Sequence, residues 1–126
     1  MQYNIGLLGE NFAKQYLESI NLKIISMRYK TKLGEVDIIS ANEKDKIIIF
    51  CEIKSTNSKA IDFENIINRK QWKRIIRAAE YFFIDENFAN YHSFDRQFDS
   101  IFISNNKIIQ HNKNIIIDDF IDDNNF

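Results

Sequence analysis

Two charged residues, Glu52 and Lys54, stand in or beside the most apolar segment of this 126-residue chain. Apart from Glu52, residues 47–53 are all Ile, Phe or Cys, which predicts a buried strand. Buried charges persist in proteins only when they are paired or bound to a metal. Asp37, in the strand-like segment before this one, supplies a second carboxylate. The pattern of Asp, a spacer and Glu-x-Lys therefore suits a divalent metal site.

The predicted pairing of the two strands brings the carboxylates together. A turn centred at Lys44 and Asp45 places Asp37 opposite Glu52, and directly paired side chains have Cβ atoms about 5 Å apart. Alternate residues of a strand share a face, so Lys54 points to the same side as Glu52. Two carboxylates this close raise the pKa of one of them unless a cation lies between them. Mg²⁺ prefers hard oxygen ligands and binds through one or two carboxylates, so we expect Mg²⁺, with Mn²⁺ as a substitute.

A metal held by Asp37 and Glu52, with the backbone carbonyl of Ile53 as a further ligand, would polarise a scissile phosphate and activate a water molecule. The Lys54 ammonium would orient that water or stabilise the developing negative charge. Glu35, on the same strand face as Asp37, is placed to assist. The alternative is a cross-strand salt bridge on a wet face of the sheet, without any chemistry.

Hydrophobic periodicity and turn residues predict the elements that position these side chains. Helices are expected from about Asn4 to Ile20 and from about Glu64 to Phe83, and strands over residues 22–29, 35–41, 46–54, 97–104 and 107–111. The order is one helix, three strands, a second helix and a final pair of strands. Because both faces of the 46–54 strand carry apolar residues, we expect it to be central in its sheet.

The second predicted helix is amphipathic. Its apolar stripe consists of Trp72, Ile75, Ile76, Ala79 and Phe83. The opposite side gathers the cations Arg69, Lys70, Lys73, Arg74 and Arg77. A charged outer face is usually only solvated, but five cations without an intervening acid also suit a phosphate backbone, so both interpretations stay open. Gln71, at the edge of the stripe, is placed to point back towards the site.

Composition limits the class of protein. With 44% hydrophobic and 28% charged residues, the chain is typical of a soluble globular protein. It has no apolar stretch of about 18 residues and no N-terminal signal pattern, so we expect no membrane segment and a cytoplasmic location. The single cysteine, Cys51, is expected to pack as a small apolar side chain. The two histidines, His92 and His111, suggest no catalytic arrangement.

Charge is unevenly distributed along the chain. We expect one domain over residues 1–114 and an acidic tail over residues 115–126. The net charge is −1, but four aspartates fall in the tail, and without them the 17 basic residues exceed the remaining 14 acidic ones. The domain itself is therefore compatible with a nucleic-acid partner.

These motifs resemble the small bacterial YraN proteins, also called the UPF0102 family. The similarity extends from about Gly9 to Ile103 and rests on Gly9-Glu10, Tyr29-Lys30, Gly34-Glu35-Val36-Asp37, Phe50-Cys51-Glu52-Ile53-Lys54, Lys70 and Phe98-Asp99. The family fold is similar to Holliday-junction resolvases and other PD-(D/E)XK nucleases. The resemblance implies an α/β (α+β) protein with an αβββαβ restriction-endonuclease-like core, a mixed central sheet and flanking helices.

The resemblance also assigns Asp37, Glu52 and Lys54 to a catalytic triplet, with Glu10 as a further acidic residue, and it is compatible with a homodimer. Three positions depart from the family pattern: Arg28, Thr56 and Gln97 stand where the family has Asn, Arg and Arg. Because Arg binds phosphate through two parallel donors, Thr and Gln cannot replace its contacts.

The leading hypothesis is a Mg²⁺-dependent nuclease that acts on DNA, including branched or irregular DNA. The second is a nucleic-acid-binding module or partner-recruiting scaffold that has a nuclease-like fold but no catalysis. A third is a protein-interaction domain without affinity for nucleic acids.

Overall fold

The computed structural model of the chain describes residues 5–56 and 68–116. In chain order their elements are α1 (Ile5–Ser19), β1 (Lys23–Lys30), β2 (Glu35–Asn42), β3 (Ile47–Thr56), α2 (Arg69–Phe82), the short 3-10 helix η1 (Glu86–Tyr91), β4 (Asp95–Ser104) and β5 (Lys107–Asn112). This order confirms the predicted one, and η1 is the addition that periodicity did not predict. Among the described residues, no helix combines the length and the apolar character needed to cross a membrane.

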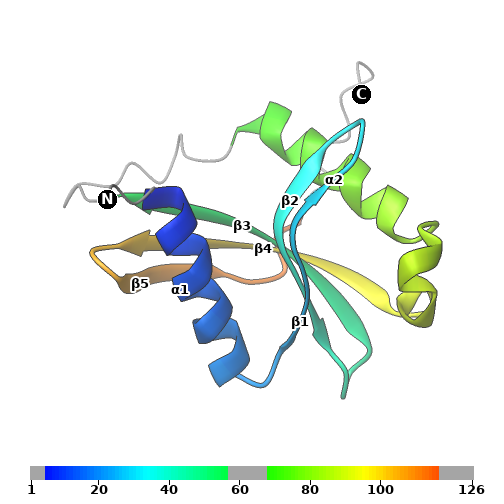
Figure 1. The fold of residues 1–126 in the computed structure, drawn as a ribbon, viewed down its shortest axis with the longest axis horizontal. Helices are drawn as coiled ribbons and strands as arrows, with labels where there is room; N and C mark the ends of the chain where they lie inside the picture. The colour runs from blue at the N-terminus through cyan, green and yellow to red at the C-terminus, as the bar shows by residue number, and fades with distance from the viewer. Residues whose placement is uncertain (1–4, 57–67, 117–126) are drawn as a thin grey trace.

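The strands form one mixed sheet in the order β1-β2-β3-β4-β5, so β3 is central as expected. β3 and β4 are parallel, whereas the other neighbours are antiparallel. Parallel neighbours need a long crossover connection, and α2 belongs to the connection between β3 and β4. α1 and α2 pack on the sheet, and the tip of the β1–β2 hairpin reaches α2 (Figure 1). The result is an α+β fold with a restriction-endonuclease-like core.

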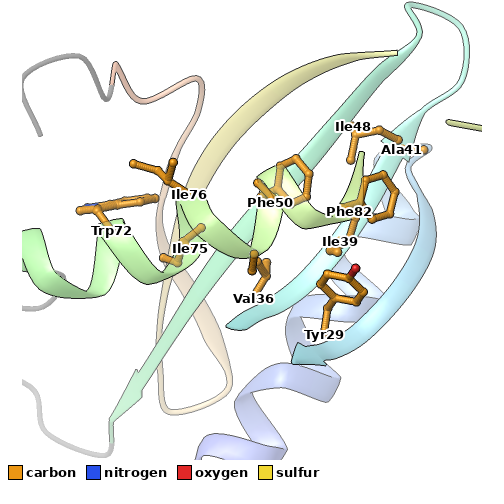
Figure 2. Packing of buried hydrophobic residues seen from close by; sticks show 12 residues of the cluster. Tyr29, Val36, Ile39, Ala41, Ile48, Phe50, Trp72, Ile75, Ile76 and Phe82 are labelled. Carbon is orange, nitrogen blue, oxygen red and sulfur yellow. The ribbon is translucent and has the colours of Figure 1, made fainter. Parts of the chain in front are cut away.

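Two apolar clusters hold the helices on the sheet. Against α2, Phe50 of β3 and Phe82 meet edge to face with their ring centroids 5.6 Å apart (Figure 2). Against α1, Ala13 and Leu17 are fully buried with Cys51. Cys51 is the small apolar side chain that the sequence predicted, and burial raises the pKa of its thiol well above the usual value.

α2 begins later than predicted, because its first turn is capped. Asn68 is extended, its side chain accepts a hydrogen bond from the N–H of Gln71, and the Gln71 side chain accepts one from the N–H of Asn68. This capping box starts the helix at Arg69. The predicted start at Glu64 lies outside the described residues.

The apolar stripe of α2 is confirmed, and its last residue, Phe83, packs against the core with its ring centroid 6.0 Å from that of Phe50. Phe82 is the fully buried aromatic residue there, and it stacks on Phe88 with centroids 4.8 Å apart. The predicted Phe83 is the C-cap and is only half-buried. At the other end of the fold, the chain still bonds to β4 at Ile115, whose N–H donates to the carbonyl of Phe98 at 2.7 Å. The predicted acidic tail lies outside the described residues from position 117.

Candidate active site

Asp37 and Glu52 lie where β2 and β3 stop pairing. The last antiparallel pair is Ile38 opposite Cys51, so the next position along each strand brings Asp37 opposite Glu52. Beyond that pair, Oδ2 of Asp37 accepts a hydrogen bond of 2.8 Å from the N–H of Ile53. The N–H of Ile53 therefore bonds to the Asp37 side chain instead of to a backbone carbonyl of β2. This bond holds the Asp37 carboxyl at the open end of the β2–β3 hairpin.

The two carboxyls form one electrostatic unit. Burial, followed by the negative charge of Asp37, raises the pKa of Glu52 to about 8, although Lys54 opposes the shift. Burial also raises the pKa of Asp37, against the hydrogen bond from Ile53. The contact between the two side chains lowers the pKa of Asp37 and raises that of Glu52, so Glu52 is the carboxyl that favours its protonated form. Without a cation, the pair retains a proton because two buried negative charges repel each other.

Lys54 lies at this pair. Its Nζ is 3.7 Å from Oε1 of Glu52, and its side chain keeps 31% exposure while that of Glu52 keeps 13%. The ammonium is therefore on the side of the carboxyls and still reaches solvent. Contact with the solvent is what a lysine that orients water or stabilises a phosphate charge requires.

α2 covers the carboxyls and leaves a small cavity of about 50 Å³. It is lined by Glu35, Asp37, Glu52, Gln71, Arg74 and Ile75. A cavity needs only about 10–15 Å³ open to a water-sized sphere to hold a water molecule, so there is room for a small ion or for water. Gln71 faces the site as predicted. Arg74 joins it, with one guanidinium nitrogen 3.5 Å from Oε1 of Glu35.

The other predicted residues of α1 and α2 do not line the cavity. Arg69 and Lys70 are exposed, whereas Lys73 and Arg77 are half-buried, and none of these four lines the cavity. Glu10 of α1 accepts a hydrogen bond of 2.9 Å from Nε of Arg28. Its negative charge contributes to the raised pKa of Asp37, so it lies within electrostatic reach of the pair.

Within the described ranges, no group of three or more His, Cys, Asp or Glu side chains is arranged to hold a metal ion. Asp37 and Glu52 line the cavity together with Glu35, and they remain the two carboxylate ligands that the sequence predicts. Two carboxylates are within the usual number for Mg²⁺, which keeps several waters.

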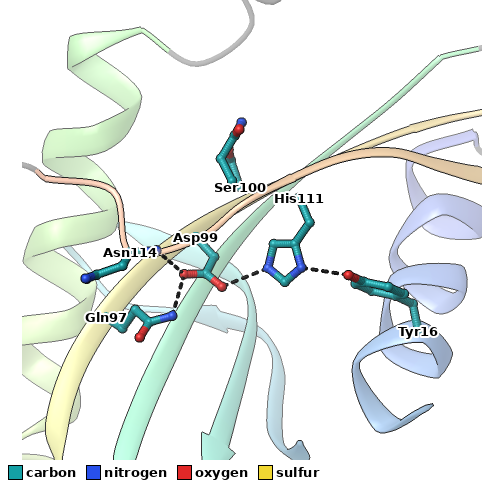
Figure 3. Close-up of polar contacts among 7 residues, drawn as sticks. Tyr16, Gln97, Asp99, Ser100, His111 and Asn114 are labelled. Atoms are coloured by element: carbon teal, nitrogen blue, oxygen red, sulfur yellow. Dashed lines mark hydrogen bonds and ion pairs between the residues drawn. The ribbon is translucent and has the colours of Figure 1, made fainter. Parts of the chain in front are cut away.

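One polar network was missed by the sequence analysis. Asp99 is 1% exposed, and its Oδ2 accepts a 2.8 Å hydrogen bond from Nε2 of His111, whose Nδ1 is 2.8 Å from the hydroxyl of Tyr16 (Figure 3). Oδ1 of Asp99 accepts hydrogen bonds from the side chain of Gln97 and the N–H of Asn114. Asp99 gave the same sequence signal as Glu52, a charged residue in an apolar strand. Its partner Tyr16 is remote in sequence, so the network could not be predicted from a local pattern.

The fold and the site together define the class: an α+β protein with a restriction-endonuclease-like core and a carboxyl pair at the open end of the β2–β3 hairpin. Sequence comparison adds the particular family: the model of UPF0102, described as an uncharacterised protein family, matches residues 9–103. The chain belongs to this family.

Three relatives illustrate the similarity. A UPF0102 protein of Campylobacter lari is 36% identical over 91 residues, which cover 69% of this chain and 79% of the relative. One from Campylobacter fetus is 36% identical over 110 residues, covering 85% and 89%. One from Sulfurihydrogenibium is 36% identical over 104 residues, covering 82% and 86%.

Proposed function

We propose that this protein is a divalent-metal-dependent nuclease that hydrolyses phosphodiester bonds in DNA, including branched or irregular DNA. The observation that carries the proposal is the pair of Asp37 and Glu52 at the open end of the β2–β3 hairpin, with Lys54 beside it and a cavity that both carboxyls line. A homodimer and a cytoplasmic location remain predictions.

The donor set fits Mg²⁺ or Mn²⁺. Carboxylate oxygens are the ligands these ions prefer, and a cation would compete with the proton that the raised pKa of Glu52 favours. Asp37 and Glu52 would hold the ion. The carbonyl of Ile53 leaves β3 on the same edge as the N–H that bonds to Asp37, which favours it as a further ligand. When bound, the ion would lower the pKa of a water molecule and polarise a phosphate.

The residues of the chain have separate tasks in this proposal. The N–H of Ile53 fixes the Asp37 carboxyl, and Lys54 orients the attacking water or stabilises the developing charge. Gln71 and Arg74, from the other wall of the cavity, would contact the scissile phosphate. Glu35 holds Arg74 by an ion pair, and Glu10 adds negative charge near Asp37.

A second candidate function is nucleic-acid binding without cleavage. It is favoured by the basic residues that α2 carries outside the cavity, of which Lys70 is exposed and Lys73 and Arg77 are half-buried. In that case the basic side of α2, with Lys70, Lys73 and Arg77, would bind phosphates while the carboxyl pair stays protonated.

Calorimetric titration with Mn²⁺ and cleavage assays on linear, flapped and four-way DNA separate the two functions. We expect the wild type to bind Mn²⁺ and cut, and Asp37→Asn and Glu52→Gln to do neither. Glu43→Gln, an exposed carboxylate in the turn at the far end of the hairpin, is the matched control and should behave as the wild type. DNA binding with equal background cleavage in all variants would favour the second function.

A further inference from the structure

A second hollow lies beside the site, between the β1–β2 turn and the C-terminal half of α2. Its volume is about 820 Å³, and it is lined by Lys30, Thr31, Lys32, Leu33 and Tyr81. Pockets that bind small molecules usually have about 300–1,000 Å³, so a nucleotide fits this volume. None of the described residues that line it is acidic.

The apolar surface of the hollow is exposed. Leu33 is 65% and Tyr81 is 48% exposed, and both line the same hollow. Single exposed apolar residues are ordinary, but an aromatic ring and an aliphatic side chain that share one hollow offer surface for a planar ligand. Lys30 and Lys32, both exposed, add positive charge at its rim.

The turn that carries these residues is held in shape from within. The hydroxyl of Thr31 accepts hydrogen bonds from the N–H groups of Leu33 and Gly34, and the N–H of Thr31 donates to the carbonyl of Gly34 at 2.8 Å. Gly34 lies against the backbone of Arg74, where a Cβ would come within 1.8 Å of the carbonyl oxygen. The hollow is therefore fixed relative to the candidate active site.

We propose that this hollow binds an unpaired nucleotide of the DNA substrate, with its base stacked on Tyr81 beside Leu33 and its phosphates at Lys30 and Lys32. An aromatic ring with neighbouring cations is the chemistry by which proteins hold single strands without reading sequence. The inference deepens the proposed nuclease function and rests on it for the substrate. It names the class: DNA in which a duplex borders unpaired nucleotides.

The spacing sets where the unpaired nucleotide lies. Tyr81 follows Arg74 by seven positions on α2, which is roughly 10 Å along the helix axis at 1.5 Å per residue. A base stacked on Tyr81 would therefore lie within a few nucleotides of a phosphate held at Arg74.

The test measures binding without cleavage, in EDTA and about 50 mM salt, where phosphate contacts are strong. Fluorescence anisotropy compares a blunt duplex with the same duplex bearing a short single-stranded extension. We expect tighter binding of the extended DNA by the wild type and by Tyr81→Phe, which keeps the ring. Tyr81→Leu should lose roughly 5- to 150-fold of affinity for it, the range that stacking on one base provides.

Lysine variants test the phosphate contacts. Lys32→Gln should lower the salt dependence of binding to the single-stranded extension by about 0.7 in the log–log slope. Lys44→Gln, a lysine of the β2–β3 turn, is the matched control and should change nothing. Equal binding by Tyr81→Leu and the wild type would overturn the proposal, as would a preference of the wild type for blunt DNA. Loss of cleavage with this binding pattern intact would instead count against the proposed nuclease function alone.

Discussion

At the scale of single residues, Glu52 makes the stability of the fold depend on pH. Its pKa is raised to about 8, mainly by burial and the charge of Asp37, so its protonated form is favoured in the folded chain. For an acid with a raised folded pKa, the stabilisation is complete below the unfolded pKa, near 4.5, and is lost as the pH rises through the folded pKa. The open end of the hairpin is therefore the place where the metal-free protein weakens at alkaline pH.

The raised pKa of Glu52 predicts that the metal-free protein becomes less stable as the pH rises. In EDTA, the melting temperature of the wild type should fall between pH 5 and pH 9, and Glu52→Gln should remove part of that fall because its side chain cannot ionise. Saturating Mn²⁺ should stabilise the wild type more at pH 8.5 than at pH 6, since the metal competes with protons. Thermal unfolding monitored by circular dichroism measures both. Glu43→Gln should follow the wild type, and identical pH profiles for wild type and Glu52→Gln would contradict the prediction.

Arg28 leads to a second prediction at this scale. Its φ is 55°, in the left-handed region, which costs most L-residues roughly 1–2 kcal/mol but which Asn adopts readily. The ion pair of Arg28 with Glu10 is partly exposed, and exposed pairs contribute about 0–1 kcal/mol. An Asn at this position, as the family resemblance implies, would suit the left-handed backbone of residue 28.

Arg28→Asn should raise the free energy of unfolding, by up to about 1 kcal/mol once the lost ion pair is counted. Arg28→Gln is the control, because it loses the same ion pair without the left-handed preference of Asn. Urea unfolding compares the two variants. The prediction is wrong if Arg28→Asn is no more stable than Arg28→Gln.

At the scale of elements, the β1–β2 hairpin and α2 meet at one glycine. A Cβ at position 34 would come within 1.8 Å of the Arg74 carbonyl oxygen, and backbone cannot move aside as a flexible side chain can. The same contact holds Glu35 near Arg74, so the packing of these two elements also shapes the wall of the candidate site.

Gly34→Ala should therefore lower the free energy of unfolding by about 1–3 kcal/mol, the usual cost of overpacking. It should also weaken Mn²⁺ binding, since the hairpin has to move away from α2. Lys32→Ala, an exposed change in the same turn, should cost less than about 0.5 kcal/mol. Urea unfolding and calorimetry measure the two effects, and wild-type stability of Gly34→Ala would mean that the close approach is not rigid.

Helices and strands could be predicted where the residues that determine them are close together in the sequence. The β2–β3 register followed from the position of one short turn, and it brought Asp37 opposite Glu52. The start of α2 was missed because Asn68 and Gln71 cap each other, a side-chain contact that hydrophobic periodicity does not record. The hydrogen bond from Ile53 to Asp37 was also beyond prediction, because it depends on the two strands separating at that point.

At the scale of the whole molecule, the Tyr16–His111–Asp99 network connects α1, β5 and β4 (Figure 3). Tyr16 and His111 are 95 positions apart, so no local pattern predicts their contact. A carboxylate can only accept hydrogen bonds, so Nε2 of His111 donates to Asp99, and in the neutral ring Nδ1 accepts from the Tyr16 hydroxyl. The network supplies the partner of Oδ2 in a buried carboxylate whose Oδ1 is bonded by Gln97 and Asn114.

Removing members of this network should destabilise the fold in a graded way. Tyr16→Phe loses one hydrogen bond and should cost about 1 kcal/mol, whereas His111→Ala leaves the Asp99 carboxylate without its ring donor and should cost about 3 kcal/mol or more. Tyr16→Phe should cost less in the His111→Ala background, because its partner is already gone. Urea unfolding of the wild type, the two single variants and the double variant measures this coupling, with the exposed Gln110→Ala as a control.

Folded Tyr16→Phe protein should bind Mn²⁺ as the wild type does, since the Tyr16 hydroxyl contacts neither Asp37 nor Glu52. Weakened Mn²⁺ binding would instead show that this network is coupled to the candidate active site.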